Sequence, residues 1–161
     1  MPLFGVGEKT GGWMAVRRGA DRIDFAHVRR ASSGRPEILL LESYRREGTE
    51  EASLLRLRKE LKLSRYRCAT LLDAGKYQTL QVEAPNVPPE ELRQAVRWKI
   101  KDLLDCPVES ATVDLIELPT DVASGRARQL FVVAAGNAVV ADPMRAFDAA
   151  GIPLDAIDIP E

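Results

Sequence analysis

Residues 77–104 decide the fold class of this chain; they read YQTLQVEAPNVPPEELRQAVRWKIKDLL. Alternation over Tyr77–Glu83 predicts a strand, and the residues from Pro88 to Leu104 predict a helix after a short turn. Two prolines suit the first helical turn, and Glu90 and Glu91 lie where the helix dipole favours negative charge. Apolar residues recur at helical spacing, so one face of this helix is expected to pack on a sheet. That face comprises Leu92, Ala95, Val96, Ile100 and Leu103.

Asp73 separates two series of predicted elements. The first series runs β-β-β-α-β and the second β-α-β-β-α-β, an order typical of a split βαβ unit. The sequence therefore predicts an α/β (α+β) fold with a flexible N-terminus at residues 1–11 and two units, residues 12–74 and 75–161. The first series comprises strands at Trp13–Val16, Arg22–Arg29 and Glu37–Tyr44, a helix that begins at Glu50, and a strand at Arg67–Leu72. The second continues past the helix above with strands at Ala111–Leu118 and Arg128–Asn137, a helix at Val139–Ala150 and a strand at Leu154–Ile159.

The composition is that of a globular protein, with 45% hydrophobic and 29% charged residues in 161. The charge is unevenly distributed along the chain. Residues 1–70 carry 15 Lys and Arg against nine Asp and Glu, whereas residues 71–161 carry eight against 15. This split indicates either a basic face for an anionic partner or surface arginines that are merely solvated, and the sequence leaves both open.

The residues that usually carry chemistry are sparse. The two cysteines, Cys68 and Cys106, fit no zinc or redox spacing, and we expect both to be inert, buried thiols. The only histidine, His27, shares the predicted buried face of its strand, which favours a structural role. The glycines of Gly5–Thr10 are wrongly spaced for a phosphate-binding loop, and too few residues precede them to form a strand. We therefore predict no catalytic, cofactor-binding or metal-binding residue, and no enzymatic activity.

Trp98 lies on the opposite side of its helix from the apolar face, among Glu91, Gln94 and Lys101. A tryptophan there exposes a large apolar surface unless something covers it, and such residues are enriched at binding hot spots. Two readings remain open: Trp98 packs against the first unit of the same chain, or it contacts a partner. The candidate partner-binding residues are Trp98, Pro85, Val87, Arg97 and Lys101.

The stretch from Tyr77 to Ile100, followed by Pro107–Glu109 and Val113–Asp114, resembles the actin-like pilus assembly proteins. Within that family it is most similar to the MSHA pilus biogenesis group (MshI), with PilM of type IV pili and GspL of type II secretion as relatives. The runs Leu130–Ala135 and Ile157–Ile159 add to the resemblance, which covers roughly residues 12–159.

This resemblance implies a fragment of an actin/Hsp70-like ATPase fold. Residues 12–74 would be the first part of the RNase H-like subdomain 1A, and residues 75–161 the inserted subdomain 1C. It also implies a scaffold or adaptor that binds other pilus or secretion assembly proteins at the cytoplasmic face of the inner membrane of a Gram-negative bacterium. No run, including Leu130–Ala135, is long enough to span a bilayer. We therefore expect membrane association through a segment outside this chain, in a longer protein that continues beyond Glu161.

Nucleotide-binding relatives of that fold carry an Asp and glycines on the first strand, whereas this chain has Trp13–Arg18 there. We therefore expect no ATP or magnesium cofactor; the alternative is one lobe of a complete, nucleotide-binding ATPase of the same machinery. The arginines of residues 1–70 alternate with acids and lack interleaved aromatics, which argues against nucleic-acid binding. Whether the chain forms a homo-oligomer is left open.

Overall fold

The computed structural model describes residues 10–119 and 127–160, and the chain divides into two compact units. The first unit contains the described residues up to Leu72 together with those from Ala141 onward, and the second contains Asp73–Val140. Of the predicted flexible N-terminus, only Thr10 and Gly11 are among the described residues. No helix within the described ranges is long and apolar enough to cross a membrane.

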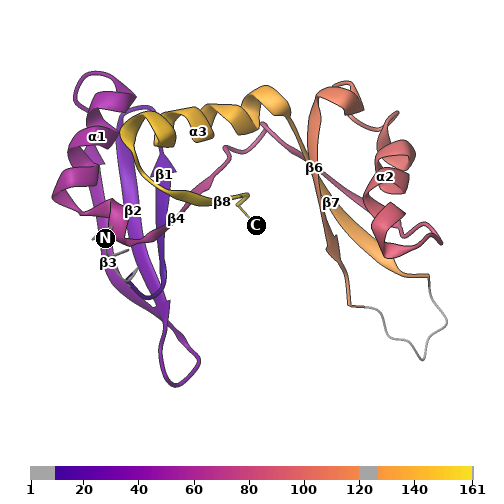
Figure 1. Cartoon of the computed structure of the whole chain (residues 1–161), viewed down its shortest axis with the longest axis horizontal. Coiled ribbons are helices and arrows are strands. Elements are labelled where there is room, and N and C mark those ends of the chain that lie inside the picture. The colour runs from indigo at the N-terminus through magenta and orange to yellow at the C-terminus, as the bar shows by residue number, and fades with distance from the viewer. Residues whose placement is uncertain (1–9, 120–126, 161) are drawn as a thin grey trace, which may run out of the picture. The chain divides into compact units, whose positions relative to one another are not determined.

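The first unit is built on a mixed five-stranded sheet in the order β3-β2-β1-β4-β8 (Figure 1). The antiparallel meander expected for its first three strands is present, because β1 pairs with β2 and β2 with β3. β4 then joins β1 in parallel, and β8 joins β4 in parallel. The strands are β1 (Trp13–Arg18), β2 (Arg22–Arg30), β3 (Pro36–Arg45), β4 (Arg67–Leu71) and β8 (Leu154–Asp158).

Helix α1 (Glu50–Glu60) begins where the sequence predicted. The Thr49 side chain caps it by accepting a hydrogen bond from the Ala52 amide at 3.2 Å, and acids in the first turn and bases in the last match the helix dipole. The later part of α3 (Asn137–Ala150) buries Phe147 in the same core that receives the buried face of α1. This first core consists of Met14, Val16, Ile23, Phe25, Leu54, Leu57, Leu63, Cys68, Phe147, Ala150 and Ile152.

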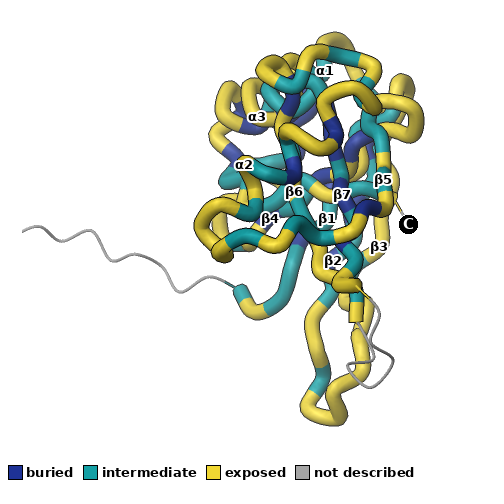
Figure 2. The backbone as a smooth tube through the Cα atoms, turned by 90° about the vertical axis from the view of Figure 1, so that its right-hand side faces the viewer, coloured by how far each residue is buried: buried dark blue, intermediate teal, exposed yellow. Residues whose placement is uncertain are grey.

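The second unit is a three-stranded antiparallel sheet in the order β5-β7-β6, with α2 (Pro89–Ile100) packed on it (Figure 1). Val96 and Ile100 of α2 are fully buried, as the helical periodicity predicted. Figure 2 colours the backbone by burial: most residues of α2 are exposed or half-buried, whereas buried and half-buried residues alternate along most of β7. The strands are β5 (Gln78–Glu83), β6 (Ala111–Glu117) and β7 (Gln129–Gly136), and the second core consists of Val82, Val96, Ile100, Leu130 and Val132.

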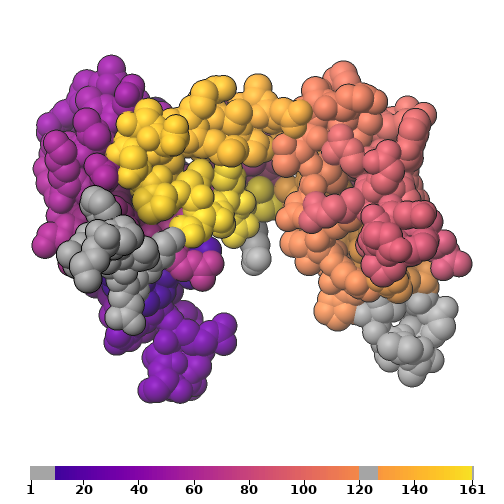
Figure 3. All heavy atoms as spheres, in the orientation of Figure 1, coloured from indigo at the N-terminus to yellow at the C-terminus, as the bar shows by residue number. Residues whose placement is uncertain are grey.

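The predicted unit of residues 75–161 differs from the observed division. β8 pairs with β4 in the first sheet, with Ala69 opposite Ala156 and the Leu72 amide hydrogen-bonded to the Asp158 carbonyl at 2.9 Å. In Figure 3 the yellow atoms of the last residues lie against the purple atoms of the first unit. The prediction assigned the last strand to the same unit as the elements that precede it in sequence. In the structure this strand instead pairs with the edge of β4 that β1 leaves free.

The predicted end of the second helix is also wrong. α2 stops at Ile100 rather than Leu104, so Leu103 leaves the expected apolar face and is 54% exposed. The structural role predicted for His27 holds: the ring is buried, and its Nε2 lies 2.9 Å from the Gly11 carbonyl oxygen. Cys68 is buried as expected, whereas Cys106 is only half-buried.

Candidate partner-binding surface

Trp98 is the large apolar side chain that α2 leaves in solvent. It is 64% exposed, while its neighbours Val96 and Ile100 are 0% exposed. Two residues along a helix correspond to a rotation of about 200°, so packing these two residues into the second core turns Trp98 outward. The outward position of Trp98 predicted from the sequence is confirmed.

Lys101 is the one candidate residue that the structure places against Trp98. Its Nζ lies 5.3 Å from the centroid of the indole ring, within the range of a cation–π contact. At an exposed site such a contact is worth about 0.5–1 kcal/mol. The pair therefore presents an apolar ring with a positive charge beside it, which suits a partner segment that combines an apolar side chain with an acidic one.

Arg97 points elsewhere and serves the unit's own structure. Its guanidinium donates hydrogen bonds to the backbone carbonyls of Ala111, at 3.0 Å, and of Val108. These bonds tie α2 to the start of β6 and satisfy carbonyls at a turn. Arg97 therefore stabilises the packing of α2 on β6 and does not lie beside Trp98.

Pro85 and Val87 lie on the connection between β5 and α2, and both are half-buried. The Val87 amide donates to the Pro85 carbonyl at 3.0 Å, which closes a tight turn. Lys99 supports this connection through a 2.8 Å hydrogen bond from Nζ to the Glu83 carbonyl. In the described part of the chain neither Pro85 nor Val87 shares a hydrogen bond or ring contact with Trp98, so of the five candidates only Trp98 and Lys101 come together.

Further exposed apolar residues escaped the sequence prediction. Ile38 and Leu41 of the edge strand β3 are 62% and 72% exposed, and Ile116 of β6 is 54% exposed. The run Ile38–Leu41 is continuously apolar, which is typical of a strand buried on both faces. The structure, and not the apolar run, shows that these side chains face solvent.

The end of β1 carries an ion cluster. Arg18 donates to Glu50 through Nε at 2.7 Å and to Asp142 through Nη2 at 2.8 Å, and its side chain is only 14% exposed. Burial by itself lowers the pKa of Arg18, but the hydrogen bonds to Glu50 and Asp142 outweigh it and raise the pKa. Arg18 therefore remains charged and joins β1, α1 and α3 within the first unit.

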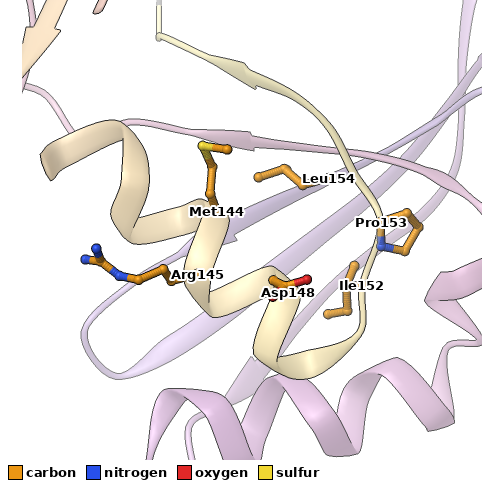
Figure 4. A pocket seen from close by; sticks show the side chains of 6 residues that line it. All are labelled: Met144, Arg145, Asp148, Ile152, Pro153 and Leu154. Carbon is orange, nitrogen blue, oxygen red and sulfur yellow. The ribbon is translucent and has the colours of Figure 1, made fainter. Parts of the chain in front are cut away.

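A surface hollow of about 440 Å³ lies between α3 and the segment that leads into β8 (Figure 4). Met144 of α3 and Leu154 of β8 point toward each other across it, whereas Arg145 extends away from Leu154. Its lining is mainly apolar, and the charged groups Arg145 and Asp148 both come from α3. Such a lining offers no set of converging polar groups with which to orient a substrate.

Within residues 10–119 and 127–160, no group of three or more His, Cys, Asp or Glu residues could hold a metal ion. The buried His27 directs Nε2 at a backbone carbonyl rather than at a nucleophile. Among the described residues of the second unit, Trp98 is the most exposed large hydrophobic residue, and Lys101 lies beside it.

No protein-family model matches the chain, and no curated protein matches it. Solved structures do. A chain of a structure described as the PilM-PilN type IV pilus biogenesis complex superposes with a TM-score of 0.69 at 22% identity, over 94% of this chain and 48% of that one. The cytoplasmic domain of EpsL, an inner membrane component of the type II secretion system of Vibrio cholerae, superposes with a TM-score of 0.63 at 15% identity, over 91% of this chain and 56% of that one.

These likenesses show the fold. The α/β (α+β) class predicted from the sequence, as a fragment of the actin-like ATPase fold, is confirmed. The chain spans about half of the length of the two similar structures.

Proposed function

We propose that this chain is a non-catalytic scaffold or adaptor domain of a machine that assembles a type IV pilus or a type II secretion system. In this role it holds another assembly protein at the cytoplasmic face of the inner membrane of a Gram-negative bacterium. The MSHA pilus is the system favoured by the sequence resemblance. Two solved proteins with this fold are components of such machines, and one of them is described in complex with a second assembly protein.

The observation that carries the binding role is the exposed indole of Trp98 beside the ammonium group of Lys101. A tryptophan that is 64% exposed contributes little to the core, yet it can bury a large apolar area against a partner. Aromatic anchors of this kind dominate the energetics of many interfaces.

The alternative is one lobe of a nucleotide-binding ATPase. It is disfavoured because β1 ends in Arg17 and Arg18 and carries no carboxylate to organise a metal. Arg18 is moreover already bonded to Glu50 and Asp142.

The test uses a PilN-like protein encoded in the same genome. Its cytoplasmic segment is titrated into this chain and the heat of binding is measured, with the Trp98→Ala variant in parallel. Micromolar binding that weakens in the variant supports the proposal. Absence of binding up to about 100 μM, near −5.5 kcal/mol of binding free energy, contradicts it for this class of partner.

A further inference from the structure

A second charged feature lies on the first unit, at the end of α1. A pocket of about 360 Å³ is formed there by the last turn of α1 and the following turn, η1 (Leu63–Arg65). Its lining contains four cations, one hydroxyl group and no carboxylate. The residues of this Arg58 pocket are Arg58, Lys59, Lys62, Ser64 and Arg65.

The four cations of the Arg58 pocket lack ionic partners among the described residues. By contrast, the neighbouring Arg56 lies 3.5 Å from Glu60 and 3.8 Å from Glu47. The acidic groups nearest in sequence are thus directed to Arg56, on another side of α1. Like charges gathered without counter-charges repel one another, so an anion in the pocket would relieve that repulsion.

Arg58 is held in place for such a ligand. Its guanidinium packs against Gly151, where an added Cβ would lie 3.3 Å from Arg58 Cζ. Its Nε atom is buried and donates to no acceptor in the described part of the chain. Packing against Gly151 restricts the Arg58 guanidinium, and a restricted donor group loses less conformational entropy when it binds a ligand.

The helix dipole explains only part of this arrangement. Arg58 and Lys59 in the last turn of α1 are favourably placed against its negative end. Lys62 and Arg65 lie beyond the helix, and Lys62 adopts a left-handed backbone conformation with φ of 53°. That turn brings the η1 residues to the same pocket as the end of α1.

We propose that the Arg58 pocket binds a phosphate group. Guanidinium and ammonium groups form short, charge-assisted hydrogen bonds to phosphate oxygens, and the Ser64 hydroxyl adds a further donor. Two sources share this chemistry: the headgroup of an anionic phospholipid and a soluble phosphate compound. The inference is independent of the protein partner proposed above, because all pocket residues lie in the first unit.

The experiment compares the full chain with two triple variants of equal charge. The pocket variant carries Lys59→Gln, Lys62→Asn and Arg65→Gln; Asn is chosen because it tolerates the left-handed conformation. The control carries Arg30→Gln, Arg35→Gln and Arg45→Gln, which are exposed and lie outside the pocket. Inorganic phosphate and pyrophosphate are titrated by NMR, and sedimentation is measured with vesicles of phosphatidylglycerol or of phosphatidylcholine alone.

The proposal predicts that the pocket variant loses about tenfold or more in affinity while the control keeps most of it. The Nε–Hε resonance of Arg58 in the unmodified chain should shift during the phosphate titration, a readout that stands even if the pocket variant does not fold. Pocket-dependent binding of phosphatidylglycerol vesicles alone assigns the site to a lipid headgroup, and binding of free phosphate or pyrophosphate assigns it to a soluble compound. An unmoved Arg58 resonance with no vesicle binding, or equal losses in both triple variants, would overturn it.

Discussion

Arg18 at the end of β1 holds Glu50 at the start of α1 through two parallel hydrogen bonds, Nε to Oε1 at 2.7 Å and Nη2 to Oε2 at 3.1 Å. The geometry is that of a two-pronged guanidinium–carboxylate pair, the strongest common form of ion pair. Because both side chains are largely shielded, with exposures of 14% and 24%, solvent screens the pair less than it screens surface pairs.

The first prediction concerns this pair. Arg18→Met keeps the length of the side chain but leaves the Glu50 carboxylate without its two donors. We expect the first unit to lose about 1.5–3 kcal/mol of unfolding free energy, measured by urea denaturation. Arg17→Met is the matched control, because Arg17 is 70% exposed and its ion pair with Asp24 is long, at 3.9 Å. This change should alter the unfolding free energy by no more than about 0.5 kcal/mol. Equal effects of the two changes would refute the structural role of Arg18.

The second prediction tests which unit α3 stabilises. Phe147 is fully buried in the first core, so Phe147→Ala should remove about 3–5 kcal/mol from the first unit. In hydrogen exchange, amides of β1 and β4 should then exchange faster while those of β5 and β7 keep their protection. Ile100→Ala, in the second core, should show the reverse pattern. If Phe147→Ala instead removes the protection of amides in β5 and β7, the result supports the predicted single unit of residues 75–161.

The third prediction separates binding from stability at Trp98. Because Trp98 is mostly exposed, Trp98→Ala should change the unfolding free energy by less than about 1 kcal/mol. It should nonetheless weaken the complex with an assembly partner by about tenfold or more in calorimetry. Met144→Ala is the control, since Met144 is 54% exposed but lies on α3. Equal partner affinity in the unmodified chain and the Trp98 variant would refute the hot-spot role.

The fourth prediction concerns nucleotide. With no carboxylate on β1 to organise magnesium, we expect no magnesium-dependent ATP binding tighter than about 100 μM in calorimetry. Weak, magnesium-independent binding that disappears in the Lys59, Lys62 and Arg65 triple variant would belong to the Arg58 pocket instead. Micromolar binding that requires magnesium would contradict the non-catalytic assignment.

Local pattern by itself determined the elements of this protein. Alternation placed β2 within one residue of its observed end, and the two acidic residues of the first turn located the start of α1 at Glu50. The same reasoning correctly predicted that His27 is buried and Trp98 exposed, because burial of one face of a strand or helix depends on spacing within that element.

Tertiary structure alone decided which distant segments meet. β8 could have extended the second sheet, yet it pairs with β4, whose sequence lies more than 80 residues away. Arg97 donates hydrogen bonds to the start of β6 instead of joining Trp98, and Arg58 packs against Gly151 from the far end of the chain. Periodicity records which face of an element avoids water, but the choice of partner for that face or edge depends on which surfaces the rest of the fold leaves uncovered.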